Sequence, residues 1–364
     1  MYSINITSVS FSLILLSIFI AYTKFSSILS LQPKNINHNI EGMRGFACIL
    51  VFINHSAFIL TNNFIENNSI DYSQFNWFGN LGSFGVELFF CITGYLFAGK
   101  IKTGSIGGDF FVKRIKRLAP AYIITSIIVF ILFMIFYGRE LSSIKDFTSV
   151  ILQVFGFGFW GSGIEIFGKK VASLNVITWT LPYEWKFYAI VPFLAAILKN
   201  QGWVVCVGVF GALALTIDII NGGILWIYFA VGFSASYIRI KEHKKITIIT
   251  LFFVMMVAFA IAIISNGFQY GPSRIVFVSI FFIAGIYSNT SVLSIKPLSL
   301  IGTISYSIYL LHLPNLFLIV NTLNIIYPLN KISIITLLTI NIIAVVATCI
   351  TSQIMYKYIE SRFK

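Results

Sequence analysis

The 364-residue chain contains few charged residues, few acidic groups and few cysteines. Only 10% of its residues are charged, whereas 58% are hydrophobic and the mean hydropathy is +0.90. A soluble globular domain carries about a quarter charged residues, so this composition excludes an ordinary soluble protein. Apolar runs of about 17 to 25 residues alternate with short polar links, and only helices span a bilayer with runs of that length. We therefore predict an all-α polytopic membrane protein.

The four cysteines lie singly in four different apolar runs, at Cys48, Cys91, Cys206 and Cys349. The sequence contains no CxxC pair and no Cys/His spacing typical of a metal site. We expect no metal and no disulfide, and we interpret the thiols as small core residues.

Acidic residues are also scarce, with 12 Asp and Glu against 25 Lys and Arg, which gives a net charge of +13. The basic residues lie in the links between apolar runs, so they favour orientation of helices in a membrane over binding to nucleic acid. The N-terminus has neither a basic n-region nor a small-residue cleavage site before Lys24. The first apolar run therefore predicts a retained helix and not a signal peptide.

Eleven membrane spans are predicted. They lie at 9–29, 43–61, 83–100, 119–138, 183–199, 203–220, 224–239, 246–265, 273–289, 302–325 and 333–356. Alternating the links between the two faces gathers most lysines and arginines on one side. The positive-inside rule makes that side cytoplasmic, with the N-terminus outside and the C-terminus in the cytoplasm. The segment 147–163 is broken by glycines, so we interpret it as re-entrant or interfacial and not as a full span.

Arg44 and His55 lie eleven positions apart on one predicted span. At helical geometry this spacing returns to within about 20° of the same face and separates the two residues by about 16 Å. An ionisable residue inside a membrane is a functional candidate by default. The spacing alone leaves open a second explanation, in which Arg44 anchors the helix at the interface and His55 is a packing residue.

A second polar stripe lies in the span 302–325, where Tyr306, Tyr309 and His312 recur every three positions. Residues at that spacing share one helical face. His55 and His312 are both expected near mid-membrane on helices that rise from the cytoplasmic side, which would allow them to face one cavity. Hydrogen bonds to neighbouring helices are the alternative explanation for these groups.

Glu87 and Glu184 begin two helices that are predicted to run inward from the outer face. A carboxylate in a first turn is favoured by the helix dipole, which is a sufficient structural explanation. The functional alternative is that one of them lies beside His55, holds its tautomer and raises its basicity.

The densest basic segment is FFVKRIKRLAPAY, just before the span that starts at 119. Its cations would bind anionic lipid headgroups at the cytoplasmic surface. Alternatively, Arg114 and Arg117 share a helix face and would hold phosphates through bidentate hydrogen bonds.

Five segments, taken in order, resemble the membrane-bound acyltransferase family 3, whose members include O-acetyltransferases of bacterial surface polysaccharides. The resemblance covers residues 40–362. Arg44 and His55 match the family's signature arginine and histidine, and Arg114 and Arg117 match its basic segment. GVELFFCITGYLF is similar to its second segment, WTLPYEWKFY to its glutamate segment, and ISYSIYLLHLP to its late histidine segment. That last segment lacks the tryptophans often found around the histidine.

The resemblance implies a ten-helix acyltransferase core at 40–364, preceded by one extra N-terminal transmembrane helix and a cytoplasmic link at 1–39. It implies an O-acyltransferase of the bacterial inner (plasma) membrane. The enzyme would move an acetyl group from cytoplasmic acetyl-coenzyme A, with no permanently bound cofactor, to a hydroxyl of a surface or lipid-linked glycan such as O-antigen. Some members carry a fused esterase-like domain after the core, and this sequence is expected to act without one of its own.

His55 is then expected to be the general base toward a sugar hydroxyl, or alternatively a transient acyl carrier, with Glu184 or Glu87 orienting it. The expected site residues are, for catalysis, His55, Glu184 and Glu87; for the donor phosphates, Arg44, Arg114 and Arg117; and, lining the substrate cavity, His312, Tyr309 and Thr93.

A transporter or exporter of a lipid-linked or small polar solute is the alternative function, with the histidines and glutamates forming a proton relay. Transporters commonly contain two repeated halves. No internal repeat is evident in this sequence, which favours the acyltransferase.

Overall fold

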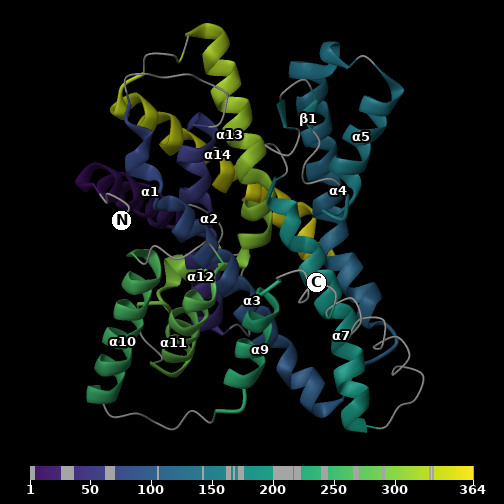
Figure 1. Cartoon of the computed structure of the whole chain (residues 1–364), viewed down its shortest axis with the longest axis vertical. Coiled ribbons are helices and arrows are strands. Elements are labelled where there is room, and N and C mark those ends of the chain that lie inside the picture. Colours follow the sequence, from purple (N-terminus) through teal and green to yellow (C-terminus); the bar gives the residue numbers. More distant parts are fainter. Residues whose placement is uncertain are drawn as a thin grey trace.

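The computed structural model describes residues 5–25, 37–61, 70–104, 106–141, 143–160, 165–166, 169–170, 176–199, 216, 223–238, 245–264, 270–288, 292–327, 329 and 332–363. These residues are almost entirely helical (Figure 1). Besides short turns, the described residues contain an antiparallel pair of two-residue strands, β1 (Glu165–Ile166) and β2 (Lys169–Lys170). The predicted all-α class is confirmed.

The long helices are α1 (Ile6–Phe25), α2 (His38–Thr61), α3 (Phe78–Thr103), α4 (Phe110–Tyr137), α7 (Leu181–Lys199), α10 (Lys245–Ile264), α11 (Pro272–Ser288), α13 (Ser305–Ile326) and α14 (Ile334–Tyr358). The shorter ones are α5 (Ile144–Phe155), α9 (Trp226–Ala235) and α12 (Lys296–Thr303). Single 3₁₀ turns occur at Tyr72–Phe75, Gly138–Glu140, Val176–Thr180 and Glu360–Phe363.

Each predicted span overlaps one of these helices, except 203–220, which lies outside the described residues apart from Thr216. Among the described residues, six helices are long and apolar enough to cross a membrane. The chain is therefore a multi-pass membrane protein, while the predicted total of eleven spans stays a prediction. The predicted division of the chain into two domains at residue 39 also stays a prediction. Helix α1 packs against α12 and α14 of the core.

The segment 147–163 forms most of α5, followed by a turn, and its last three residues lie outside the described part. α5 has 12 residues, so it is about 18 Å long and too short for a hydrocarbon core of about 30 Å. Its end is fixed to α4, because the hydroxyls of Tyr122 and Ser126 donate to the Val154 carbonyl at 2.9 and 2.8 Å. This geometry agrees with leaving the segment out of the count of full spans.

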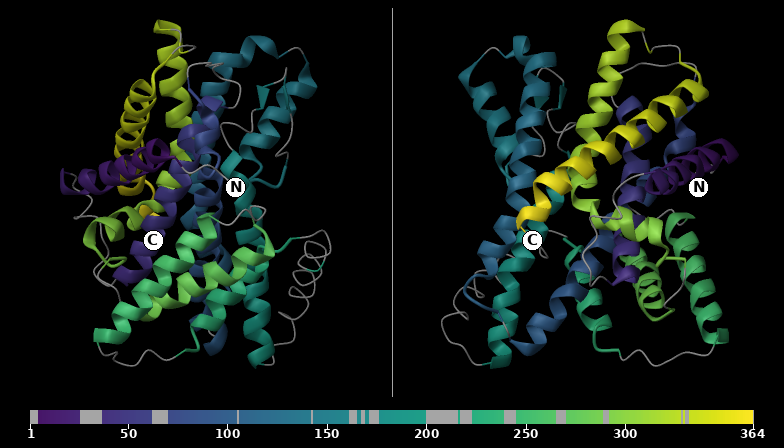
Figure 2. Two further views of the ribbon diagram at one scale, coloured as in Figure 1. Left: turned by 60° about the vertical axis from the view of Figure 1, so that its left-hand side comes forward. Right: turned by 180° about the vertical axis from the view of Figure 1, so that it is seen from behind.

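Helix α2 lies at the centre of the packing, with α12 on one side and α3 on the other (Figures 1 and 2). Glycines line both contacts. A Cβ at Gly45 would lie 2.1 Å from the Leu298 carbonyl oxygen, and one at Gly302 would lie 1.9 Å from the Glu41 carbonyl oxygen. A Cβ at Gly85 of α3 would lie 2.6 Å from the Ala47 carbonyl oxygen of α2. Small residues at these positions let the helix backbones touch, which is how helices associate tightly in lipid.

Helices α2 and α13 run parallel and in register. Cys48 Sγ lies 3.5 Å from the Ser305 carbonyl oxygen, and His55 Nδ1 lies 2.9 Å from His312 Nε2. Both contacts join residues 257 positions apart. The constant offset means that the two helices advance side by side, as expected for two spans that start from the same face.

A fully buried ion pair ties α3 to α11. Arg274 donates from Nε and Nη2 to the two carboxylate oxygens of Glu87 at 2.9 and 3.0 Å, and neither side chain has exposed surface. The guanidinium also donates to the carbonyls of Ala262 on α10 and Asn80 on α3, at 2.9 and 3.1 Å. The bidentate geometry and the extra acceptors compensate two charges that would be costly to bury singly.

We expect Gly302→Ala to destabilise the protein by about 1–3 kcal/mol, because the added methyl meets backbone and not a movable side chain. Gly99→Ala in α3 is the matched control, since a Cβ there has no heavy atom within 4 Å. It should be neutral or slightly stabilising. Thermal unfolding in detergent, followed by tryptophan fluorescence, measures both. Equal melting temperatures for the two variants would contradict the close α2–α12 contact.

The ion pair is tested by a double-mutant cycle. Glu87→Gln or Arg274→Gln alone should cost about 3–5 kcal/mol of unfolding free energy, because each leaves a buried charge without its partner. The double variant should cost less than either single change. Additive losses in chemical unfolding would show that the two side chains are not coupled.

Candidate active site

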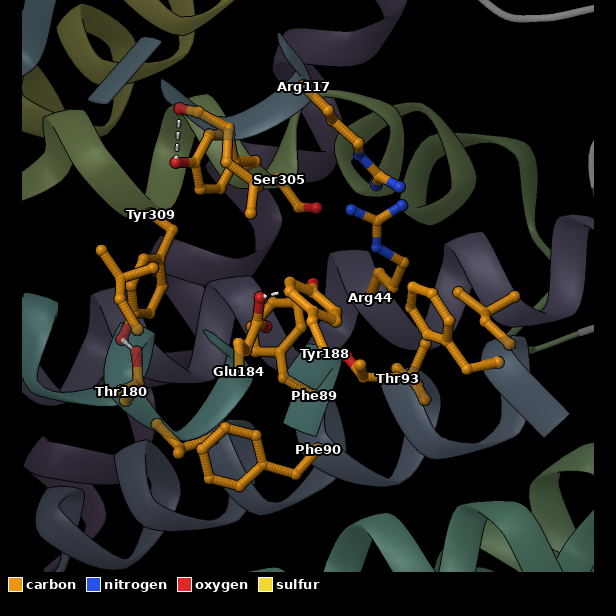
Figure 3. Close-up of a pocket in the computed structure, with 17 residues that line it drawn as sticks. Arg44, Phe89, Phe90, Thr93, Arg117, Thr180, Glu184, Tyr188, Ser305 and Tyr309 are labelled. Carbon is orange, nitrogen blue, oxygen red and sulfur yellow. Dashed lines mark hydrogen bonds between the residues drawn. The ribbon is translucent and has the colours of Figure 1, made fainter. Parts of the chain in front are cut away.

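A cavity of about 100 Å³ lies where α2, α3, α4, α7 and α13 converge (Figure 3). Most of its wall is apolar and comes from α3, α4 and the start of α7. The polar side chains that line it are Arg44, Thr93, Arg117, Thr180, Glu184, Tyr188, Ser305, Tyr306 and Tyr309. Polar groups from distant parts of the sequence therefore converge on one small apolar space, which is typical of a ligand site.

One end of the cavity carries arginines. In Figure 3 the guanidinium groups of Arg44 and Arg117 point toward one another from α2 and α4. Arg44 donates to Glu41 Oε1 at 2.9 Å, and its side chain is 15% exposed. Arg114, one turn before Arg117, lies over the Phe97 ring with 5.3 Å between the guanidinium carbon and the ring centroid. Two facing guanidinium groups repel each other, and an anion between them removes that repulsion.

Glu184 lies beside this arginine cluster. The Tyr188 hydroxyl, one turn further along α7, donates to Glu184 Oε2 at 2.9 Å. The carboxylate is also within electrostatic reach of Arg44, Arg114 and Arg117. Its position therefore places a carboxyl group next to the arginine end of the cavity.

The opposite end of the cavity is built by Tyr309 of α13. Its hydroxyl donates to the Ile177 carbonyl at 2.8 Å and lies 2.8 Å from Thr180 Oγ1. One turn earlier, the Tyr306 hydroxyl donates to the Leu118 carbonyl of α4 at 3.0 Å. The tyrosine stripe predicted on α13 thus faces inward and holds α4 and the turn before α7.

A pair of histidines lies one helical turn beyond Tyr309. His55 Nδ1 is 2.9 Å from His312 Nε2, and His312 Nδ1 is 2.8 Å from the Tyr309 carbonyl and 3.1 Å from the Ile308 carbonyl. The side chain of His312 is 1% exposed. The two histidines are not among the residues that line the cavity in the described part of the chain, but the ring of Tyr309 adjoins that of His312, with 6.1 Å between the ring centroids.

The structure gathers five of the predicted site residues around the cavity, namely Arg44, Arg117, Glu184, Thr93 and Tyr309. It also brings the two predicted histidines into contact, and it places Arg114 beside Arg117. The expected neighbour of His55 was a glutamate, whereas the structure places His312 against its Nδ1. Glu87 is instead held by Arg274, because that cation lies opposite it in the interior.

Several residues escaped the sequence analysis. Tyr188 follows Glu184 at i,i+4 spacing, so a helical-face argument would have found it. Arg274 is an ionisable residue at the start of an apolar run. This position predicts a buried partner for the side chain, but it does not identify that partner. The hydrogen bond from Ser307 Oγ to the buried Glu360 ties the C-terminal turn to α13, and no spacing in the sequence indicates it.

Comparison with known proteins shows the family of the chain. The sequence model of an acyltransferase domain family, acyltransferase 3, matches residues 37–357. That range contains the arginine cluster, the cavity and the histidine pair. No solved structure matches the chain.

Three relatives illustrate the similarity. The chain is 26% identical to O-acetyltransferase OatA of Staphylococcus aureus, over 88% of this chain and 56% of the relative. It is 25% identical to peptidoglycan O-acetyltransferase OatA of Listeria monocytogenes, over 89% of this chain and 55% of the relative. It is also 25% identical to putative acetyltransferase ORF330 of Acidianus two-tailed virus, over 78% of this chain and 84% of the relative. The match therefore spans little more than half the length of the two OatA relatives. Since the family model covers most of the sequence, the chain belongs to the acyltransferase 3 family of membrane proteins.

Proposed function

We propose that the protein is an O-acetyltransferase that moves an acetyl group from acetyl-coenzyme A to a hydroxyl of a glycan. The observation that carries this proposal is one continuous cavity that runs from the Arg44 and Arg117 pair to Tyr309, which lies one turn before His312, the residue that contacts His55. Acyl transfer needs a site for the donor phosphates, a space for the thioester and a general base. The arginines, the small apolar cavity and the histidines would provide them. The names of the OatA relatives support an acetyl group and a glycan acceptor.

The arginines would bind the phosphates of the donor. Arg44, Arg117 and the adjacent Arg114 provide planar groups that pair with phosphate oxygens in bidentate fashion. The cavity has a volume of about 100 Å³, roughly that of three waters in the liquid. This space fits an acetyl thioester but not a nucleotide, so the nucleotide would lie outside it on the arginine side. The apolar wall keeps water from the thioester.

His55 would act as the general base. It takes the proton of the acceptor hydroxyl, the hydroxyl oxygen attacks the thioester carbonyl carbon, and the carbon–sulfur bond breaks. The proton then passes to the departing thiolate, so that coenzyme A leaves as the thiol. Proton transfer by a positioned side chain contributes about 10²–10⁴-fold to such reactions. A route in which His55 itself carries the acetyl group uses the same residue as nucleophile.

The donor would be bound from the cytoplasm and the acceptor from outside. Acetyl-coenzyme A carries several charges and does not cross a bilayer, whereas an acetyl group passes along a cavity lined by a few polar groups. The arginine end belongs to the side that is rich in Lys and Arg, which the positive-inside rule makes cytoplasmic. The protein would then lie in the bacterial plasma membrane with its N-terminus outside, and a lipid-linked or surface glycan would be the acceptor.

Replacing the base tests the reaction. His55→Ala should lower acetyl transfer by about 10²–10⁴-fold, while the protein inserts and folds normally. Purified protein in liposomes with radiolabelled acetyl-coenzyme A and a glycan acceptor measures the transfer. His38→Ala is the control, because His38 lies at the first turn of the same helix and contacts Ser299. Full activity of His55→Ala would remove His55 from the mechanism, and solute movement without any labelled acceptor in the wild type would favour a transporter.

Replacing the cations tests the donor site. Arg114→Ala combined with Arg117→Ala should weaken binding of coenzyme A at least about tenfold, since a hydrogen bond to a charged group is worth roughly 1.5–3 kcal/mol. Lys116→Ala removes an exposed cation of the same helix and controls for net charge. Calorimetric titration of the protein in nanodiscs gives the three affinities. Equal affinities would contradict the assignment of the two arginines.

A further inference from the structure

A second imidazole lies against Nδ1 of His55, whose ring also has a hydrogen bond with the backbone of Val51. A catalytic histidine is commonly held by a carboxylate, and the sequence offers two glutamates for that position. The structure instead places His312 Nε2 2.9 Å from His55 Nδ1. The two glutamates have other partners, Arg274 for Glu87 and Tyr188 for Glu184.

The hydrogen bonds of His312 determine which of its nitrogens carries the proton. Its Nδ1 lies 2.8 Å from the Tyr309 carbonyl oxygen and 3.1 Å from the Ile308 carbonyl oxygen. Carbonyl oxygens only accept hydrogen bonds, so Nδ1 must be the N–H nitrogen. A neutral imidazole has one N–H, and Nε2 of His312 is therefore an acceptor.

The tautomer of His55 follows from that of His312. Its Nδ1 faces the accepting Nε2 of His312 at hydrogen-bonding distance. Two acceptor nitrogens at 2.9 Å would repel each other, so His55 Nδ1 must carry the proton. The lone pair of the neutral His55 ring then lies on Nε2, on the side of the ring away from His312.

We propose that His312 is a positioning residue that fixes His55 in the Nδ1–H tautomer and so makes its Nε2 the basic atom. This inference rests on the proposed role of His55 as general base. In the other tautomer Nε2 would carry a proton and accept none. The wrong tautomer costs about 10⁴-fold in a serine protease whose orienting aspartate is replaced by asparagine.

A neutral partner suits this position in the protein. A carboxylate buried in a membrane bundle needs its own cation, as Glu87 needs Arg274. His312 is 1% exposed and brings no charge to the site. When His55 takes the proton of the acceptor hydroxyl on Nε2, its Nδ1–H bond to His312 becomes charge-assisted and stronger. The proton leaves again to the thiolate as the carbon–sulfur bond breaks, and both rings return to their starting tautomers.

Nitrogen NMR reads the tautomers without any substrate. The protein has four histidines, so protein labelled with ¹⁵N-histidine gives few signals, and the His55→Ala and His312→Phe variants assign them. We expect both rings to carry their proton on Nδ1. A His55 signal with the proton on Nε2 would overturn the proposal. Because neither donor nor acceptor is present, this outcome is independent of whether the proposed acetyl transfer is correct.

Kinetics separate positioning from a purely structural role. His312→Phe keeps a ring but has no acceptor, and it should lower kcat at least about 10²-fold, with the KM for acetyl-coenzyme A unchanged. His312→Gln supplies an amide oxygen as acceptor and should recover at least tenfold of that loss. Asn315→Ala, one turn further along α13, is the control, since Asn315 contacts Thr351 and not the histidines. Equal losses for the Phe and Gln variants, or full kcat for the Phe variant, would overturn the proposal.

Discussion

The close packing of α2 between α12 and α3 is the constraint on which the site depends. α2 carries Arg44 near one end and His55 eleven residues later, and glycines let its neighbours approach to backbone contact on both sides. The helix therefore has little freedom to rotate or slide. Since α13 runs beside it in constant register, the position of α2 also determines where Tyr309 and His312 meet it. Two helices thus align the arginine end, a small apolar cavity and a pair of imidazoles.

The structure compensates its buried polar groups in different ways, and the differences indicate their roles. Arg274 and Glu87 neutralise each other completely and hold three helices together. In the proposed tautomers both rings of the histidine pair are neutral, and Nδ1 of His55 donates to Nε2 of His312. At the cavity, by contrast, the guanidinium groups of Arg44 and Arg117 face one another from two helices (Figure 3). An anionic ligand between them would compensate their charges. The first arrangement stabilises the fold, whereas the other two are suited to binding and chemistry.

Much of the fold and of the candidate site could be predicted from the sequence, because apolar runs of membrane length and residues that share a helical face are local signals. The helices, the inward face of Tyr309 and His312, and the position of Arg44 and His55 along one line all follow from such signals. The partners across helices do not. Which group contacts His55, and which cation meets Glu87, depends on how α2, α3, α11 and α13 pack, and no spacing within one helix encodes that. The sequence therefore indicated the residues of the site better than their pairing.

In the proposed mechanism, the donor phosphates, the thioester and the base lie along one line between the arginines and the histidines. The most direct test is an electron cryo-microscopy structure of the protein with a non-hydrolysable acetyl-coenzyme A analogue, in which a methylene group separates sulfur from the carbonyl carbon. We predict phosphate groups within hydrogen-bonding distance of Arg114 and Arg117, and the acetyl carbonyl inside the cavity near Tyr309, facing Nε2 of His55. An analogue bound away from the arginines, or one whose acetyl group lies outside the cavity, would contradict the account.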